Sequence, residues 1–208
     1  MFGGNFQTWK LHSAQDYFMF FAYILAGVLV FWLIAKHMNK QRNHEKAVEK
    51  VSGRLKKICG KPGEVLKNAT LNLPEGKMTF DVVLMDKRGV YLVRTYGWGI
   101  KIYGTPDGAM WRREDAKRKE EFENPLLELK KGAAEITKVM EENGVQNLKV
   151  MPMVVFADNF QTPELYLGYG SFSTTYQELK NWYKKQSGVK EVQYDYDKVS
   201  SIIKRLAK

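Results

Sequence analysis

This chain has little of the chemistry from which many protein sites are built. Its single cysteine, Cys59, excludes an internal disulfide and any metal site made of several cysteines. All three histidines (His12, His37 and His44) lie near the N-terminal apolar segment, so we expect no histidine-based metal site in the rest of the chain. Carboxylates, cations and aromatic side chains remain as the groups that a site would use.

Acidic residues are also outnumbered. The sequence has 23 Asp and Glu against 33 Lys and Arg, which gives a net charge of +10. An excess of this size favours anionic partners, either nucleic acid or an anionic membrane surface, although it also serves solubility. A length of 208 residues suits one domain of ordinary size with an appendage.

One long run near the N-terminus carries no charge. It comprises the 19 residues from Tyr17 to Ala35 and is bounded by Asp16 and Lys36. About 20 apolar residues cross a hydrocarbon core as a helix, so the run predicts a transmembrane helix over 17–35 after a short N-terminus of 1–16. A cleaved signal peptide fits less well, because only Lys10 precedes the run.

The charges that flank this run predict its orientation. Nine Lys and Arg stand between Lys36 and Lys61, whereas the N-terminal side has only Lys10. The positive-inside rule then places residues 1–16 outside the cytoplasm and the main domain, 61–208, inside it. We therefore expect a single-pass membrane protein whose basic juxtamembrane segment is also suited to anionic lipid headgroups.

Residues 36–60 are mostly polar but carry an apolar stripe at helical spacing. The stripe consists of Ala47, Val48, Val51, Leu55 and Ile58. This spacing predicts a basic amphipathic helix that ends at Gly60 and Pro62. We expect it to pack on the domain, and a protein partner bound through this helix is the alternative.

The rest of the chain reads as an α/β domain. Strands are expected at 64–71, 77–85, 89–96 and 100–104, then a polar loop to 124, a helix over 125–142, a buried strand over 149–156, a short strand at 164–168, a helix from Thr174 or Thr175, and a last helix from Asp197. The tetrad 86–89 predicts a hairpin with a loop of four or five residues. We expect one mixed sheet with helices on its faces.

Two charged residues interrupt the apolar strands of this hairpin. Asp81 lies within the first strand, and Arg94 lies within the second, two residues before Tyr96. A charge in a buried strand is costly unless it is paired or has a function. The hairpin is therefore the first place to look for chemistry.

The order of several short motifs resembles a known family. The motifs are Val65-Leu66-Lys67-Asn68, Phe80-Asp81-Val82-Val83, Gly89-Val90-Tyr91-Leu92-Val93, Ile102-Tyr103-Gly104, Trp111, Phe122-Glu123-Asn124-Pro125 and Val154-Val155-Phe156. In this order they resemble the NERD (nuclease-related) domain of the PD-(D/E)XK nuclease superfamily, from about Glu45 to Asp158. The resemblance implies a mixed-sheet, restriction-endonuclease-like core with flanking helices. Members of that family often carry an N-terminal membrane helix.

The resemblance also implies where a catalytic centre would lie. Enzymes of the superfamily hold a Mg²⁺-type ion with an Asp from one strand and a Glu from a Glu-x-Lys motif on the next. Asp81 matches the Asp, whereas Arg94 and Tyr96 occupy the positions of the Glu and the Lys. Glu45 matches a carboxylate of the first helix, although His44 replaces the Gly expected before it.

Three interpretations of this centre follow. In the first, the nuclease centre is degenerate, and Arg94 pairs with Asp81 and also with Glu45, with no metal or other cofactor bound. In the second, the chain is an active Mg²⁺-dependent nuclease whose groups have moved to Glu128, where a Gln is expected, and to Lys101. In the third, Asp81 and Arg94 are an ordinary structural pair. We expect the first, a pseudoenzyme.

Basic residues near this centre are candidates for binding nucleic acid. They are Lys101, Arg112, Arg113, Lys117, Arg118 and Lys119, with the rings of Trp98, Tyr103 and Trp111 close by in sequence. Acidic residues alternate with them, which favours a solvated surface of mixed charge, and the two tryptophans are more typical of a core. The expected function is a membrane-anchored module that binds nucleic acid or protein, or a structural subunit of a membrane complex.

Overall fold

The structure is a computed structural model that describes residues 14–41, 43–115, 118–158, 161–186 and 194–207. The chain divides into two compact units, residues 1–40 and residues 41–208.

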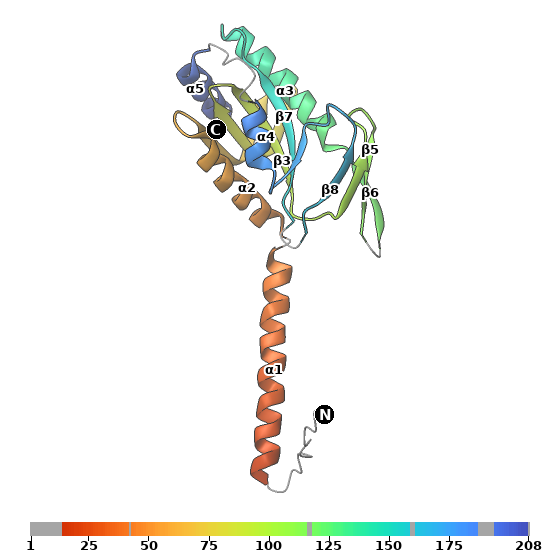
Figure 1. The fold of residues 1–208 in the computed structure, drawn as a ribbon. Coiled ribbons are helices and arrows are strands. Elements are labelled where there is room, and N and C mark those ends of the chain that lie inside the picture. The colour runs from red at the N-terminus through yellow and green to blue at the C-terminus, as the bar shows by residue number, and fades with distance from the viewer. Residues whose placement is uncertain (1–13, 42, 116–117, 159–160, 187–193, 208) are drawn as a thin grey trace. The chain divides into compact units, whose positions relative to one another are not determined.

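The first unit contains one long helix, α1 (Ala14–Gln41), drawn in red and orange in Figure 1. Its stretch 14–36 has 23 residues and is long and apolar enough to cross a membrane. At a rise of 1.5 Å per residue it spans roughly 35 Å, against about 30 Å for a hydrocarbon core. None of the side chains in this stretch is buried within the protein, which supports membrane association of the chain.

The core of the second unit is a five-stranded mixed sheet in the order β1-β2-β3-β7-β9. The first three strands are antiparallel, whereas β7 is parallel to β3 and to β9. The strands are β1 (Glu64–Leu73), β2 (Gly76–Asp86), β3 (Gly89–Tyr96), β7 (Val150–Phe156) and β9 (Ser173–Thr175).

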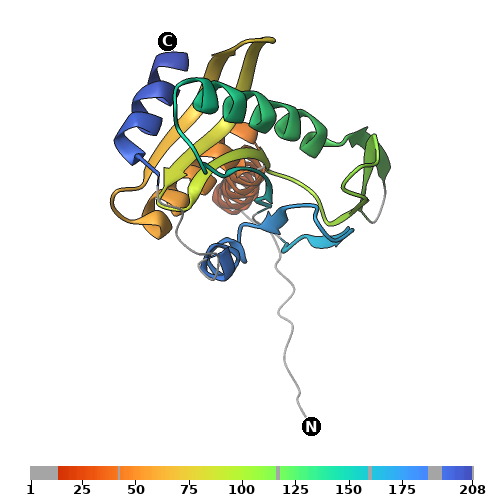
Figure 2. The same ribbon diagram turned by 90° about the horizontal axis from the view of Figure 1, so that it is seen from above.

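Helices cover both faces of this sheet. One face packs against α3 (Pro125–Glu142) and α5 (Tyr196–Leu206), and the other against α2 (His44–Cys59) and α4 (Leu179–Gln186). Figure 2 shows the sheet between α3 and α4. Strand β7 is buried along most of its length, so its near-continuous apolar sequence correctly predicted a strand covered on both faces.

The amphipathic helix is shorter than the predicted segment 36–60. Helix α1 continues to Gln41, and α2 begins at His44 because the Asn43 side chain accepts the Glu45 N–H at 3.0 Å and caps the helix. The predicted apolar stripe packs against the sheet, with Val51 and Leu55 fully buried. The apolar side of α2 thus packs against the domain, and only the polar side of this helix is available to bind a partner.

A second sheet, in the order β6-β5-β4-β8, was not predicted. It contains β4 (Lys101–Gly104), β5 (Met110–Glu114), β6 (Lys119–Glu123) and β8 (Glu164–Leu167). The expectations of a single sheet and of a polar loop over 105–124 were therefore wrong. Strands β5 and β6 direct mainly Trp111 and Phe122 toward the core, and most of their other residues are charged, so they lack the apolar alternation that marks a strand.

Two local boundaries also differ from the predictions. Asp86 pairs with Gly89, so the hairpin loop has two residues and not four or five. Gly89 makes this possible with a φ of 143°, which an L side chain rarely adopts. The helix expected from Thr174 or Thr175 begins at Leu179, although the Thr175 hydroxyl does accept the Glu178 N–H at 3.2 Å.

Candidate degenerate nuclease centre

Asp81 lies at the point in strand β2 where the alternation of side chains between the two faces of the sheet shifts by one residue. Phe80 and Val83 belong to the core beneath α3 and α5, whereas Val82 belongs to the core beneath α2 and α4. Opposite this point on β1, Asn68 has a φ of 48°, a left-handed conformation that Asn tolerates better than most residues. The Asp81 side chain therefore enters neither apolar core and is directed toward β3.

Both oxygens of the buried Asp81 carboxylate have partners. Oδ2 accepts the Thr95 backbone N–H at 2.6 Å and the Thr95 hydroxyl at 3.0 Å. Oδ1 lies 3.3 Å from Arg94 Nη1 and 3.3 Å from His44 Nε2. The residue is only 3% exposed, and a charge so deeply buried needs such partners to be stable.

Arg94 joins this carboxylate to a second one. Its Nη2 lies 2.7 Å from Glu128 Oε2 on α3 and 3.3 Å from the Thr79 carbonyl oxygen. Burial by itself would lower the pKa of the Arg94 guanidinium, but Asp81 and Glu128 outweigh burial and raise the pKa above its ordinary value. Arg94 therefore carries a positive charge throughout the physiological pH range.

The expected third partner, Glu45, is replaced by the residue before it. Glu45 is exposed, and among the residues that the structure describes its carboxylate pairs with neither Asp81 nor Arg94. His44, the first residue of α2, contacts Asp81 instead. In the sequence His44 stands out only as the residue before Glu45, and the helix cap at Asn43 is the local signal that places it at the start of α2.

Tyr96, at the position of the motif lysine, belongs to an aromatic cluster. Its ring stacks on Phe156 with centroids 5.5 Å apart and contacts Trp98 at 4.7 Å and Phe122 at 5.6 Å. Burial raises the pKa of Tyr96 to about 12, so the side chain is neutral at physiological pH. It supplies neither an ammonium nor a base.

The two relocated groups of the active-enzyme interpretation are not brought together. Glu128 reaches the centre, but its carboxylate is bound to Arg94. Lys101 lies on β4 in the second sheet, with its ammonium 3.9 Å from Glu164, and it makes no contact with Asp81 or Glu128 among the described residues.

This arrangement does not fit a Mg²⁺-type ion. Such an ion prefers several oxygen ligands in near-octahedral geometry, and here a guanidinium occupies the space between the two carboxylates. Among the described residues, no group of three or more His, Cys, Asp or Glu is arranged to hold a metal. Arg94 already compensates part of the negative charge that a metal would meet there.

Two of the predicted nucleic-acid contacts have acidic partners on strands β5 and β6. Arg113 pairs with Glu120, and Lys119 lies 2.6 Å from Glu114. Arg118 is exposed and its backbone N–H donates to an Asp115 carboxylate oxygen at 2.8 Å, whereas Lys117 lies outside the described residues. These pairs agree with a mixed-charge surface.

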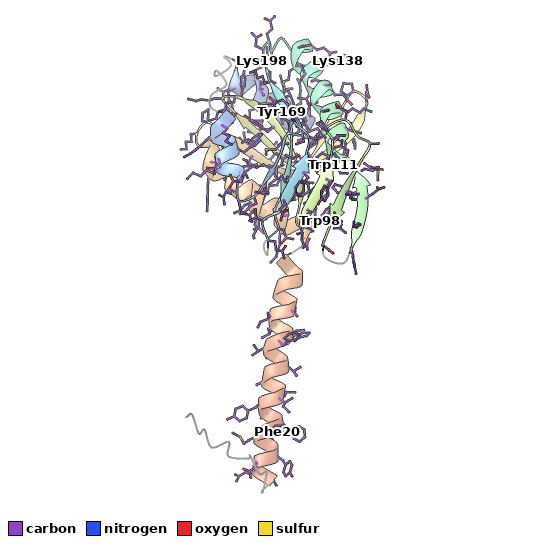
Figure 3. The ribbon with its side chains drawn as sticks, turned by 45° about the vertical axis from the view of Figure 1, so that its right-hand side comes forward. Phe20, Trp98, Trp111, Lys138, Tyr169 and Lys198 are labelled. Carbon is purple, nitrogen blue, oxygen red and sulfur yellow. The ribbon has the colours of Figure 1, made fainter. Side chains whose placement is uncertain are left out.

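One part of this surface combines a cation with two stacked rings, one of which is exposed. The Tyr103 and Tyr166 rings stack with centroids 4.8 Å apart, Tyr166 is 51% exposed, and the Arg112 guanidinium lies 5.0 Å from the centre of the Tyr103 ring. The two tryptophans behave as core residues. Trp111 is buried and Trp98 packs against the core. Both are labelled in Figure 3.

Comparison with known proteins identifies the family of the chain. Neither a curated protein nor a solved structure matches the chain. The profile of one family, described as NERD, nuclease-related domain, matches residues 40–157, which is more than half of the chain. The matched range includes Asp81, Arg94, Tyr96 and Glu128. The chain therefore belongs to the nuclease-related domain (NERD) family.

Proposed function

We propose that this protein is a membrane-anchored, cytoplasm-facing NERD module that has lost metal-dependent nuclease activity and acts by binding nucleic acid. One observation carries the loss of activity: the Arg94 guanidinium lies between Asp81 and Glu128, where the superfamily needs an open carboxylate site. A metal ion could bind there only by displacing Arg94 from both carboxylates. Breaking such a partly buried ion pair costs several kcal/mol, which opposes binding of the ion.

The exposed Tyr166 ring on β8, with Arg112 and Tyr103 beside it, supports binding of a single strand. Cations that follow a phosphate backbone, together with rings on which bases stack, are typical of surfaces that bind single-stranded nucleic acid. Arg112, Tyr103 and Tyr166 provide this combination, and the net charge of +10 favours the same class of partner. Lys101, Arg113, Lys117, Arg118 and Lys119 would contribute further phosphate contacts.

Fluorescence anisotropy with a labelled single-stranded oligonucleotide tests the binding. The full-length protein in phosphatidylcholine nanodiscs should bind the oligonucleotide with an affinity that falls steeply as salt is raised. Arg112→Gln combined with Tyr166→Ala should weaken binding about tenfold or more, because stacking on one base contributes roughly 1–3 kcal/mol. The single variant Lys138→Gln on α3 is a control for lost charge. Absence of binding would leave a protein scaffold or a structural subunit of a membrane complex.

The same preparation tests the loss of catalysis. With Mg²⁺ or Mn²⁺ present, neither DNA nor RNA should be cleaved above the background of an Asp81→Asn variant. Metal-dependent cleavage that Asp81→Asn abolishes would show an active nuclease. A reporter fused to the C-terminus, which fluoresces only in the cytoplasm, tests the orientation.

A further inference from the structure

A basic cavity lies between helices α2 and α4, on the face of the main sheet opposite α3. Its volume is about 720 Å³. One carboxylate, Glu49, lines it, together with six cations: Lys50, Arg54, Lys57, Arg88, Lys180 and Lys184. In the whole chain cations outnumber carboxylates much less, by 33 to 23, so the lining is strongly enriched in positive charge.

Helical spacing brings these cations to one cavity. Lys50 and Arg54 are four residues apart on α2, and Lys180 and Lys184 are four residues apart on α4. Residues at this spacing share one face of a helix and are separated by about 6 Å along its axis. Both helices turn their apolar faces to the sheet, so two rows of cations border the space between them.

The wall formed by the β2–β3 turn is attached firmly to α4. The buried Asp86 carboxylate accepts both the Tyr183 hydroxyl and, at 2.8 Å, the Arg88 backbone N–H. The Arg88 guanidinium lies 4.0 Å from the centre of the Tyr183 ring and donates to the Tyr183 carbonyl oxygen at 2.8 Å. Arg88 is therefore held at the cavity before any ligand arrives.

A tyrosine orients two cations of α2 in a similar way. The Arg54 guanidinium lies 4.7 Å from the centre of the Tyr176 ring, and the Lys50 ammonium lies 5.8 Å from it. Within the part of the chain that the structure describes, no carboxylate forms an ion pair with Lys50, Arg54, Lys57, Arg88 or Lys180. This distinguishes the cavity from strands β5 and β6, where Arg113 and Lys119 are paired with glutamates.

The chemistry of the cavity indicates its ligand. Several fixed cations without acidic partners fit a compact anion that carries more than one phosphate. The volume falls within the range of about 300–1,000 Å³ that is usual for small-molecule sites. The Tyr183 ring is buried and both rings are already covered by cations, so they offer no stacking platform to a nucleic-acid strand.

A bilayer is also a poor fit to this face. Among the described residues of the second unit, the exposed large apolar side chains are Met110, Leu127, Tyr166, Tyr169 and Phe172. None of them lines the cavity, and its own apolar lining, Ile58, Tyr176 and Tyr183, is half-buried or buried, so the described surface here offers no exposed apolar group to insert between lipids. We propose that the cavity binds a soluble organic polyphosphate of nucleotide size, with its phosphates held by the cations of α2 and α4. This inference does not depend on the nucleic-acid surface or on the state of the nuclease centre.

Titration calorimetry on the full-length protein in phosphatidylcholine nanodiscs tests this site, with ATP, inorganic tripolyphosphate and adenosine as probes. ATP and tripolyphosphate should bind and adenosine should not. The variant Arg54→Gln with Lys180→Gln should weaken ATP binding about tenfold or more, since a hydrogen bond to a charged group contributes roughly 1.5–3 kcal/mol. Circular dichroism should show that this variant remains folded.

A matched pair of substitutions controls for the loss of two charges. Lys138 and Lys198 lie on α3 and α5, on the other face of the sheet, and are labelled at the top of Figure 3. Lys138→Gln with Lys198→Gln should change ATP affinity by less than about twofold, because distant exposed charges are screened by salt. Failure of ATP and tripolyphosphate to bind, or equal weakening by both pairs, would overturn the proposal.

Two competition experiments distinguish the sources of phosphate. If nanodiscs with phosphatidylglycerol weaken ATP binding in the wild type but not in the Arg54→Gln, Lys180→Gln variant, lipid headgroups occupy the cavity and the proposal is wrong. If a single-stranded oligonucleotide binds more tightly than ATP and the same variant abolishes its binding, the cavity belongs to nucleic acid. ATP affinity that is the same in both lipids and little affected by the oligonucleotide supports a soluble polyphosphate.

Discussion

Arg94 Nη1 on β3 lies 3.3 Å from the carboxylate of Asp81 on the adjacent strand β2. In an active member of the superfamily this carboxylate would face a divalent cation, and here it faces a guanidinium. The Thr95 N–H and hydroxyl hold the other Asp81 oxygen, so the carboxylate is fixed on both sides. Arg94 thus supplies a positive charge directly beside the buried carboxylate.

The contact between Arg94 and Asp81 predicts that Arg94 is needed for the stability of the fold. Arg94→Ala would leave the buried Asp81 carboxylate without its guanidinium, and such losses cost about 3–5 kcal/mol for fully buried pairs. The Arg94 side chain is 20% exposed, so we expect roughly 2–3 kcal/mol, at or below the lower end of that range. Urea unfolding followed by tryptophan fluorescence measures the free energy of unfolding.

Glu128→Ala serves as the comparison for this prediction. The Glu128 side chain is 50% exposed, and exposed ion pairs contribute about 1 kcal/mol or less. Glu128→Ala should therefore lower the free energy of unfolding clearly less than Arg94→Ala does. Equal losses, or a negligible effect of Arg94→Ala, would mean that the guanidinium does not compensate Asp81.

The left-handed residue opposite Asp81 gives a second prediction. Asn68 has a φ of 48°, which a β-branched side chain adopts only with strain, so Asn68→Val should cost about 1–2 kcal/mol of the free energy of unfolding. Asn68→Gly should be close to neutral, because glycine adopts this conformation freely. Thr70→Val, on an ordinary position of the same strand, is the control. If valine is tolerated equally at both positions, the shift in alternation at Asp81 does not depend on Asn68.

The contact between β1 and α5 predicts a dependence on pH. Glu64 Oε2 lies 2.8 Å from Lys204 Nζ and accepts the Ser200 hydroxyl at 3.0 Å. The hydrogen bond to Lys204 is the main cause that lowers the pKa of Glu64 below its ordinary value of 4.5. A lowered pKa in the folded state adds stability above the unfolded pKa, and this stability is lost as the pH falls through the folded pKa.

Glu64→Gln tests the sign of this effect. At pH 7 the variant should be less stable by about 1 kcal/mol or less, because the pair is partly exposed. The difference from the wild type should shrink as the pH falls below 4.5 and through the lowered pKa of Glu64 in the folded state, where the carboxylate becomes protonated. Lys204→Gln should show the same trend. A difference that is constant with pH would assign the loss to packing and not to charge.

The main sheet was predictable because its sequence signals are local. Strands β1 to β3 have alternating or continuous apolar residues bounded by turns, and α3 begins at Asn124-Pro125, where the Asn124 side chain caps the helix. The hairpin of β5 and β6 was missed for the opposite reason. Trp111 and Phe122 face the core, and the charges around them pair across the strands, which no local pattern indicates.

Of the contacts in the nuclease centre, only the pairing of Asp81 with Arg94 could be predicted from the sequence. Asp81 and Arg94 lie on adjacent strands of one hairpin, so their pairing follows from the hairpin itself. Glu128 and His44 arrive from helices whose positions depend on tertiary packing, and the role of Glu128 as a partner of Arg94 was not foreseen. The basic cavity was hidden for the same reason, because its two helices are separated by more than 100 residues.

Manganese binding measured by electron paramagnetic resonance tests the central claim most directly. The wild type in phosphatidylcholine nanodiscs should not bind Mn²⁺ at the centre. The fraction of Mn²⁺ bound should therefore be the same for the wild type and for the Asp81→Asn variant. Arg94→Glu removes the guanidinium and places a third carboxylate beside Asp81 and Glu128, so this variant should gain a Mn²⁺ site that Asp81→Asn abolishes. Stoichiometric Mn²⁺ binding by the wild type that is lost in Asp81→Asn would contradict the account.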